Sequence, residues 1–364
     1  MSLWIPYFLV MLIIVVLSLG IPDIEWYEQS GMRVRDWKSY KETFLMITLI
    51  LMVFCAFRSI QANSIDEYAY RNRFFIFQNY DFATALDKAD GEYINSILTW
   101  IISKTFHTSQ GVFIVFGSLT VLFYMLALKR YSGSFPFAVA LLMSMGIINT
   151  SFNITQQSLG CAIFVFFCDS IYERKFLKYI LVVLCCIYIH NSAIMLLPLY
   201  LCGNHKEKDA KIKPYILLGS FVIFYVYSNL SVLAPRLPML GQYVERAESL
   251  SGISTNWITI LVNCVPAIIA LVTRNRIDSD DKISMVAGNM CLVHACIFLV
   301  AILDNYIARL ALYTAPFCVI FLSRSIKMFS ESSRKIFIWG AVILYSIEVY
   351  LRMQGYVYIF NFAF

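Results

Sequence analysis

The sequence predicts an all-α polytopic membrane protein, and three observations support this fold class. The chain of 364 residues is 60% hydrophobic and only 14% charged. Its apolar residues come in continuous blocks, and its basic residues are scattered in the short loops between those blocks. The net charge of +6 therefore does not form the basic face that nucleic-acid binding requires, and we expect no nucleic acid as a partner.

The apolar blocks have lengths that suit membrane spans, because a helix needs about 20 apolar residues to cross a bilayer. We expect about 10–12 transmembrane helices in a single transmembrane domain, residues 1–364, with no internal repeat. The first block is predicted to be a retained span, since it lacks the features of a signal peptide. The blocks lie near 3–20, 43–57, 111–128, 135–149, 154–172, 176–189, 191–203, 214–230, 256–273, 283–303, 306–323 and 335–352.

Basic residues predict which loops face the cytoplasm, because Lys and Arg beside membrane spans are retained there. Six clusters alternate correctly if all six are cytoplasmic, and they hold 20 of the 29 Lys and Arg residues. Two crossings must then separate Lys178 from Lys206, so the chain has to turn near residue 190 in a short-helix or re-entrant region. The clusters are Arg33, Arg35, Lys38 and Lys41; Lys129 and Arg130; Arg174, Lys175 and Lys178; Lys206, Lys208, Lys211 and Lys213; Arg274, Arg276 and Lys282; and Arg324, Lys327, Arg334 and Lys335.

The opposite, exoplasmic side carries the two longest loops, 58–110 and 231–255. Within the first loop, residues 91–107 (GEYINSILTWIISKTFH) are typical of an amphipathic helix that lies in the membrane interface. Long polar loops on one side of a bundle are where we expect a functional site.

The ten cysteines are predicted to be buried free thiols. Nearly all lie inside apolar blocks, and none has CxxC or Cys/His ligand spacing. We therefore expect no metal site, no disulfide framework and no cofactor.

Two arginines stand at the exoplasmic ends of blocks. Arg58 closes the second block, and Arg309 lies about four residues inside a late block, with Asp304 one and a half turns before it. A snorkelling anchor would also explain Arg58, and a structural pair with Asp304 would also explain Arg309. An arginine inside a membrane span is nevertheless a functional hypothesis by default.

The other candidates are polar residues in apolar or aromatic surroundings on the same side. Each of them also has a purely structural explanation: a hydrogen-bonded turn for the histidine, a solvated loop for the acid and the tyrosines, and hydrogen bonds between helices for the glutamines. The residues are His190 in the turn, Asp66 followed by Tyr68 and Tyr70, and Gln156 with Gln157 at the head of the fifth block.

Arg58, Arg309, His190, Asp66 and Asp304 are all predicted to lie on one side of the membrane, at the depth of lipid head groups. Arginine binds phosphate oxygens through two parallel hydrogen bonds. A histidine or carboxylate nearby can take a proton from a hydroxyl. This combination fits a lipid diphosphate whose leaving group must be stabilised as it departs.

Three stretches resemble the Wzy-type polysaccharide polymerases, and specifically the EpsG-like family of exopolysaccharide and O-antigen polymerases. The first is FRSIQANSIDEYAY, with an arginine after a span and then Asp and Tyr. The second begins ITQQSLG and ends IHNSAIMLLPLYL, with a Gln-containing span, a basic turn and His-x-Ser-Ala; the family commonly has arginine where Thr155 stands. The third, YIARLALYTAPF, carries the late arginine and a Pro-containing run.

The resemblance implies an inverting, metal-independent glycosyltransferase of the membrane-embedded C class in the bacterial cytoplasmic (inner) membrane. Its substrates would be undecaprenyl-diphosphate-linked oligosaccharide donor and acceptor at the outer leaflet, and further partners would be membrane lipids and a chain-length regulator protein. Arg58 and Arg309 would bind the diphosphate, and His190, Asp66 or Asp304 would activate the acceptor hydroxyl. The sugar groove would be lined by Tyr68, Tyr70, Gln156, Gln157, Arg236 and Arg246.

Two other functions remain open from the sequence. A glycan ligase that transfers a finished glycan to a lipid core would use the same chemistry. A flippase or transporter of lipid-linked oligosaccharides would also be polytopic, basic and aromatic, but transporters tend to carry charged residues at the midplane and internal repeats.

Overall fold

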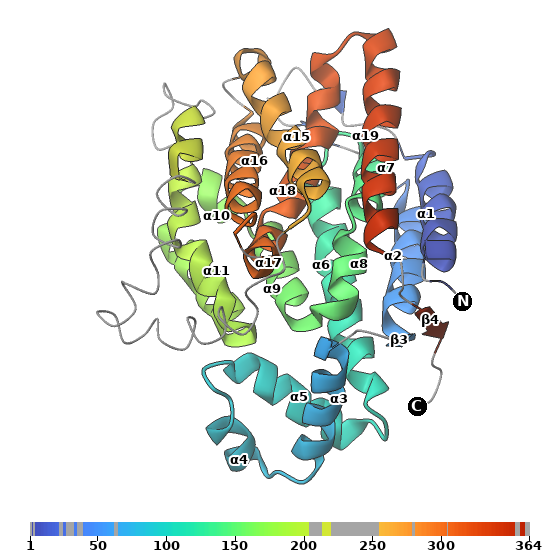
Figure 1. Ribbon diagram of the computed structural model, residues 1–364, viewed down its shortest axis with the longest axis vertical. Helices are drawn as coiled ribbons and strands as arrows, with labels where there is room; N and C mark the ends of the chain where they lie inside the picture. Colours follow the sequence, from blue (N-terminus) through green and yellow to red (C-terminus); the bar gives the residue numbers. More distant parts are fainter. Residues whose placement is uncertain are drawn as a thin grey trace.

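The protein is a bundle of helices with a small helical cap at one end (Figure 1). The computed structural model describes residues 2, 4–21, 25–26, 33–34, 39–61, 65–203, 213–219, 255–278, 281–303, 305–353 and 357–360. The helices of the N-terminal half are α1 (Trp4–Ser18), α2 (Lys41–Ala56), α3 (Ile65–Gln78), α4 (Phe82–Asp87), α5 (Tyr93–Thr105), α6 (Gln110–Tyr131), α7 (Phe135–Ser144), α8 (Ile147–Asn153), α9 (Thr155–Phe166) and α10 (Asp169–Tyr172).

The C-terminal half continues the bundle. Its helices are α11 (Phe176–Ile189), η1 (Asn191–Cys202), η3 (Pro214–Leu217), α15 (Trp257–Thr273), η6 (Arg274–Arg276), α16 (Lys282–Val300), α17 (Asn305–Ala308), η7 (Arg309–Tyr313), α18 (Ala315–Ser325), η8 (Ile326–Met328) and α19 (Glu331–Arg352). The structure also has two short antiparallel strand pairs, which the all-α prediction leaves out. β1 (Glu25–Trp26) pairs with β2 (Arg33–Val34), and β3 (Arg58–Gln61) pairs with β4 (Val357–Phe360).

The predicted fold class, an all-α polytopic membrane protein, is confirmed. Among the described residues, three helices are long and apolar enough to cross a membrane alone: α6, α15 with η6, and α16. Two consecutive helices, α7 and α8, pass the same test together although they meet at a bend of 43°. Several remaining apolar blocks fold as shorter helices, which agrees with the uneven block lengths in the sequence.

Gly146 makes the bend between α7 and α8. Its φ of 72° lies in the left-handed region, which favours glycine. A side chain at this position would also collide with α19, because an added Cβ would come within 2.6 Å of Val349 Cγ2 and 2.8 Å of Arg352 Nη2. The glycine therefore allows both the bend and the close approach of α19.

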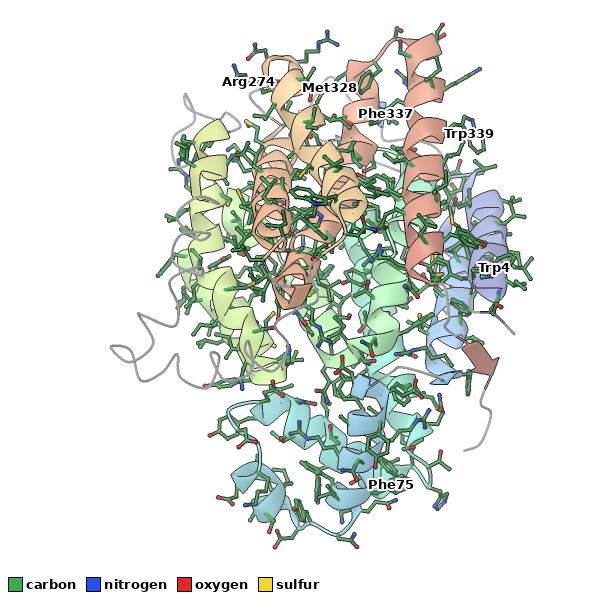
Figure 2. The ribbon with its side chains drawn as sticks, viewed as in Figure 1. Trp4, Phe75, Arg274, Met328, Phe337 and Trp339 are labelled. Atoms are coloured by element: carbon green, nitrogen blue, oxygen red, sulfur yellow. The ribbon has the colours of Figure 1, made fainter. Side chains whose placement is uncertain are left out.

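The core lies where long helices meet. Helix α6 packs against α2 and α9, and α16 packs against α15 and α18. The outer flank is apolar and exposed, as lipid contact requires; Trp339 on α19, for example, is exposed at the side of the bundle (Figure 2).

The predicted turn near residue 190 is confirmed. Helix α11 ends at Ile189, the extended residue His190 follows, and η1 runs back along α11. The ring of Phe176 lies 5.3 Å from that of Tyr200, and the Tyr179 hydroxyl donates to the carbonyl of Leu196, so the two helices are antiparallel. Since a 3₁₀-helix rises about 2 Å per residue, the twelve residues of η1 extend further than an α-helix of equal length.

Described parts of the predicted cytoplasmic loops lie at one end of the bundle, opposite the cap. Arg274 and Met328 lie at that end, and Phe75 of the cap lies at the other (Figure 2). Arg276 donates to the carbonyl of Met328, and Arg130 pairs with Asp169, so loops far apart in sequence meet there. Which end faces the cytoplasm stays a prediction.

Candidate functional site

The candidate site lies where the cap meets the bundle (Figure 1). Side chains from five places in the chain converge there: α3, the residue before α5, the head of α9, the turn between α11 and η1, and η7. Most of these places carry residues that the sequence analysis selects.

His190 forms a pair with Glu92, a residue 98 positions earlier. Its Nδ1 lies 2.8 Å from Glu92 Oε1. Because an ionised carboxylate can only accept, Nδ1 carries the proton, and the lone pair of neutral histidine is then on Nε2. Nε2 has no hydrogen-bond partner among the residues that the structure describes, and the side chain is 30% exposed. This geometry gives His190 the tautomer of a general base.

Glu92 is held by a network of donors. The backbone N–H of Asn191 donates to its Oε1 at 3.0 Å, and the Asn95 side chain donates to its Oε2 at 2.9 Å. Arg73 Nη1 lies 3.8 Å from Oε2. Burial raises the pKa of Glu92. The hydrogen bond from His190, the positive charge that this histidine carries when it is protonated, and the two amide donors outweigh burial, so the net pKa is lowered. Glu92 is therefore a fixed carboxylate that orients the imidazole.

Arg309 pairs with Asp66 of α3, with Nη1 3.3 Å from Oδ2. Both groups are partly exposed, at 38% and 25% of their side-chain surface, and the contact lacks hydrogen-bond geometry at Oδ2. The Gln157 side chain donates to the backbone carbonyl of Arg309 at 3.1 Å, which ties η7 to the head of α9. The pair expected as an alternative, Arg309 with Asp304, cannot be described because Asp304 lies outside the described residues.

Tyr70 lies on α3 between Asp66, which pairs with Arg309, and Arg73, which approaches Glu92. Burial raises the pKa of its hydroxyl, as do the carboxylates of Asp66 and Glu92, while Arg309 and a backbone hydrogen bond from Gln156 lower it. Asp66, Tyr70 and Arg73 are spaced i, i+4 and i+7, so they share one face of α3. The hydroxyl of Tyr70 therefore lies within the field of both ion pairs.

Of the remaining groove candidates, the structure describes Tyr68, Gln156 and Gln157. Tyr68 is 75% exposed on the other side of α3. Gln156 and Gln157 are buried at the head of α9, where hydrogen bonding between helices accounts for Gln157. Arg236 and Arg246 lie outside the described residues, so their predicted part in the sugar groove stays a prediction.

Arg58 is buried and bound by protein. Its guanidinium donates to the carbonyls of Cys55, Ser151 and Phe152 and, at 2.8 Å, to the hydroxyl of Thr155. The side chain is 1% exposed and stacks over the ring of Phe152. These contacts join the end of α2 to α8 and α9. The geometry favours an anchoring role, the alternative explanation for this residue, over direct binding of a diphosphate.

Sequence reasoning misses Glu92, Arg73 and the hydroxyl pair of Ser192 with Tyr313, whose oxygens lie 3.0 Å apart. Arg73 could have been found, because it follows Asp66 and Tyr70 at helical spacing. Glu92 could not, since only the fold brings it to His190. Among the described residues, no group of three His, Cys, Asp or Glu side chains could hold a metal ion.

The comparison with known families agrees with the resemblance. The model of the EpsG family matches residues 41–362, which is nearly the whole chain. No curated protein and no solved structure matches this chain. The chain therefore belongs to the EpsG family, which indicates a membrane protein of polysaccharide biosynthesis with a polymerase-like function.

Proposed function

We propose that this EpsG-family chain is a polysaccharide polymerase, an inverting glycosyltransferase that joins undecaprenyl-diphosphate-linked oligosaccharide repeats. The reaction would take place at the outer leaflet of the bacterial cytoplasmic membrane. A growing chain is transferred from its lipid carrier to a sugar hydroxyl of a new lipid-linked repeat.

This proposal rests on two partly exposed side-chain pairs in the candidate site. One pair suits an anionic leaving group and the other suits a hydroxyl acceptor. Arg309 with Asp66 offers a cation to a diphosphate, and His190 with Glu92 offers a base to a hydroxyl. The charges of Asp66, Arg309 and Glu92 all act on the Tyr70 hydroxyl, which supports the proposal that both pairs belong to one site. An acceptor hydroxyl and a departing diphosphate are the two groups that such a site has to handle together.

In the proposed step, the acceptor hydroxyl oxygen attacks the anomeric carbon of the donor sugar. His190 Nε2 takes the hydroxyl proton as the bond from the anomeric carbon to the phosphate oxygen breaks. The electron pair leaves on the lipid diphosphate, whose added charge Arg309 stabilises after the diphosphate displaces Asp66. Attack from the face opposite the leaving group inverts the anomeric centre.

His190 is the preferred base among the three candidates. Asp66 is held by Arg309 in the absence of substrate, and Asp304 lies outside the described residues. Tyr68 and the glutamines of α9 remain proposed contacts of the oligosaccharide, together with Arg236 and Arg246. A chain-length regulator remains a proposed partner.

The rival functions differ in what they require of the opposite end of the bundle. A flippase must open that end, whereas Arg324 there binds Asp281, Ser284 and the backbone of Tyr131 together in a buried cluster. This closure supports a polymerase over a flippase. A ligase would share the same site chemistry.

Gene deletion followed by gel analysis of surface glycans separates the three functions. Glycans that stop at a single repeat support the polymerase. Loss of all repeats indicates a flippase or an earlier step, and accumulation of free polymer indicates a ligase; either result overturns the proposal.

The proposed sidedness has its own test. Cysteines introduced at Asn191, in a background without native thiols, should react with a reagent that cannot cross the membrane. Cysteines at Arg276 should not react. Labelling of position 276 from outside would place the site on the wrong side of the membrane.

A further inference from the structure

Helix α5 buries several polar side chains beside the apolar Ile102 and exposes large apolar side chains on its outward face. Four polar residues of this helix are buried: Asn95, Ser96, Thr99 and Ser103. Tyr93 and Ile101 are instead exposed over nearly half of their surface, and Ile97 lies between them, half-buried, on the same face. An amphipathic helix at a water-facing surface would turn its large apolar side chains toward the protein.

The buried polar groups of α5 are satisfied within the cap. Arg73 of α3 donates to the Ser96 hydroxyl at 2.8 Å, and Asn95 donates to Glu92. The hydroxyls of Thr99 and Ser103 bond within the helix. The inward side therefore needs no water, and among the described residues none covers Tyr93 and Ile101 on the outward face completely.

The outward face of α5 continues the outer surface of α11. Four apolar residues of α11 are exposed at spacings of i, i+4, i+7 and i+11, which forms one stripe: Leu177, Leu181, Leu184 and Tyr188. The last of them meets Tyr93, the first residue of α5, with ring centroids 5.6 Å apart. Since α11 is an apolar helix of a membrane protein, we take its exposed stripe to face lipid. The contact of Tyr188 with Tyr93 places the start of the α5 face, which continues with Ile97 and Ile101, beside the end of this stripe.

The far end of α5 carries residues that suit a membrane boundary. Trp100 packs edge-on against Phe82 at 5.2 Å and donates its indole N–H to the carbonyl of Tyr80. Lys104 lies over the Trp100 ring and directs its ammonium group to the carbonyl of Gln78. Tryptophan and lysine are enriched at the level of lipid head groups, where an apolar body and a polar tip are both accommodated.

We propose that the face of α5 formed by Tyr93, Ile97 and Ile101 is seated against the acyl chains of the adjacent membrane leaflet. The cap is then partly sunk into lipid rather than standing in water below the bundle (Figure 1). Because Glu92 directly precedes α5 and bonds to His190, their pair lies at the same depth as the start of this lipid-covered face. A lipid head group could reach His190 without leaving the membrane.

The test compares three single cysteines that carry a bimane fluorophore, in vesicles of phosphatidylcholine. The positions are Ile101 on the proposed face, Leu181 on the stripe of α11 as the lipid control, and Asp87 of α4, whose side chain is 76% exposed, as the water control. Cys185 and Cys264 are first replaced by serine, because the other eight thiols are buried. Quenching is measured with phosphatidylcholine brominated on its acyl chains and separately with iodide in the buffer.

We expect the fluorophore at 101 to lose fluorescence to brominated lipid as strongly as at 181, and to resist iodide. Quenching by iodide as strong as at 87 would mean that water covers the face. Resistance to both quenchers would mean that protein covers it, either a partner or a second copy. Each of these last two results overturns the proposal, and neither bears on whether the protein polymerises sugars.

Discussion

The ion pairs at the two ends of the bundle differ in how far the protein encloses them. At the end predicted to face the cytoplasm, Arg324 and Asp281 are 2.7 Å apart and only 6% and 8% exposed. Arg324 also donates to Ser284 and to the carbonyl of Tyr131. At the cap end, the pair of Arg309 with Asp66 is longer and several times more exposed.

The difference separates charges that hold the fold from charges that are available to a ligand. A buried pair in which each guanidinium nitrogen donates a hydrogen bond is costly to break, because one charge is left unpaired in a low-dielectric interior. A partly exposed pair without hydrogen-bond geometry contributes little to stability, and an incoming anion can replace its carboxylate. The same residue types therefore act as a structural clamp at one end and as a candidate binding site at the other.

The largest expected effect is the loss of all polymer in Arg309→Lys. A lysine keeps the charge but not the planar fork that binds two phosphate oxygens at once. Polymer formation is measured in vitro from lipid-linked repeats, with Arg276→Lys, exposed at the opposite end, as the matched control. Full-length polymer from Arg309→Lys at a normal protein level would reduce Arg309 to a helix anchor.

At the opposite end, Arg324→Ala should cost about 3–5 kcal/mol of the free energy of unfolding, because it leaves Asp281 buried and unpaired. Arg276→Ala at the same end should change stability by less than about 0.5 kcal/mol, since its side chain is exposed. Unfolding is followed in detergent. Equal free energies of unfolding for the two variants would mean that Arg324 stabilises the fold no more than the exposed Arg276 does.

His190→Gln should make polymer at least about 10²-fold more slowly while it inserts and folds normally. Glutamine can donate and accept like the histidine, but it does not titrate near neutral pH, so it cannot exchange a proton with the acceptor. Asn191→Ala and Ser192→Ala are milder controls. Near-normal turnover by His190→Gln would leave Asp66 or Asp304 as the candidate base.

The fold was largely predictable because lipid imposes long apolar blocks and a charge bias, and both are local in sequence. The turn at His190 followed from counting crossings between two basic loops. The division of one apolar block into two helices, α7 and α8, was not predictable from the sequence. The bend at Gly146 involves the close approach of Val349 and Arg352, which lie more than 200 residues later. The strand pair of β3 with β4 depends on the same kind of long-range contact.

The site was only partly predictable, for the same physical reason. Arg309 and His190 stand out because polar groups are costly in apolar blocks. Arg58 stands out equally, yet it is buried and bound to the backbone of α8. Nothing local in the sequence distinguishes it from the partly exposed Arg309. Glu92 lies in an ordinary polar loop, and only its distance to His190 gives it a role.

Glu92→Gln should reduce the turnover number about tenfold, roughly the worth of one charge-assisted hydrogen bond of about 1.5 kcal/mol. The amide oxygen can still accept from Asn191, so the turn should persist, but the imidazole loses a charged partner. A positioning residue should change kcat with little change in KM or Tm. A fall in Tm with normal kcat would instead make Glu92 a structural residue of the cap.

The smallest expected effect is a difference in acid stability between the wild type and Glu92→Gln. The folded pKa of Glu92 lies below its ordinary value of 4.5, so the carboxylate stabilises the folded cap fully above that value. That contribution is lost as the pH falls through the lowered folded pKa. Asp281 at the other end also has a lowered pKa and titrates with the same sign, so the wild type alone cannot report on the cap.

Subtraction isolates the cap in this acid titration. Tm is measured from pH 7 downward for both proteins. The gap in Tm between the two curves should be small and constant near neutral pH and should narrow below the ordinary value of 4.5. The clamp of Arg324 with Asp281 is present in both chains, so its loss in acid cancels. Parallel curves throughout would mean that His190 and Asn191 do not stabilise the Glu92 carboxylate in the folded state. The candidate site at the cap end would then lack the fixed carboxylate on which the proposed base depends.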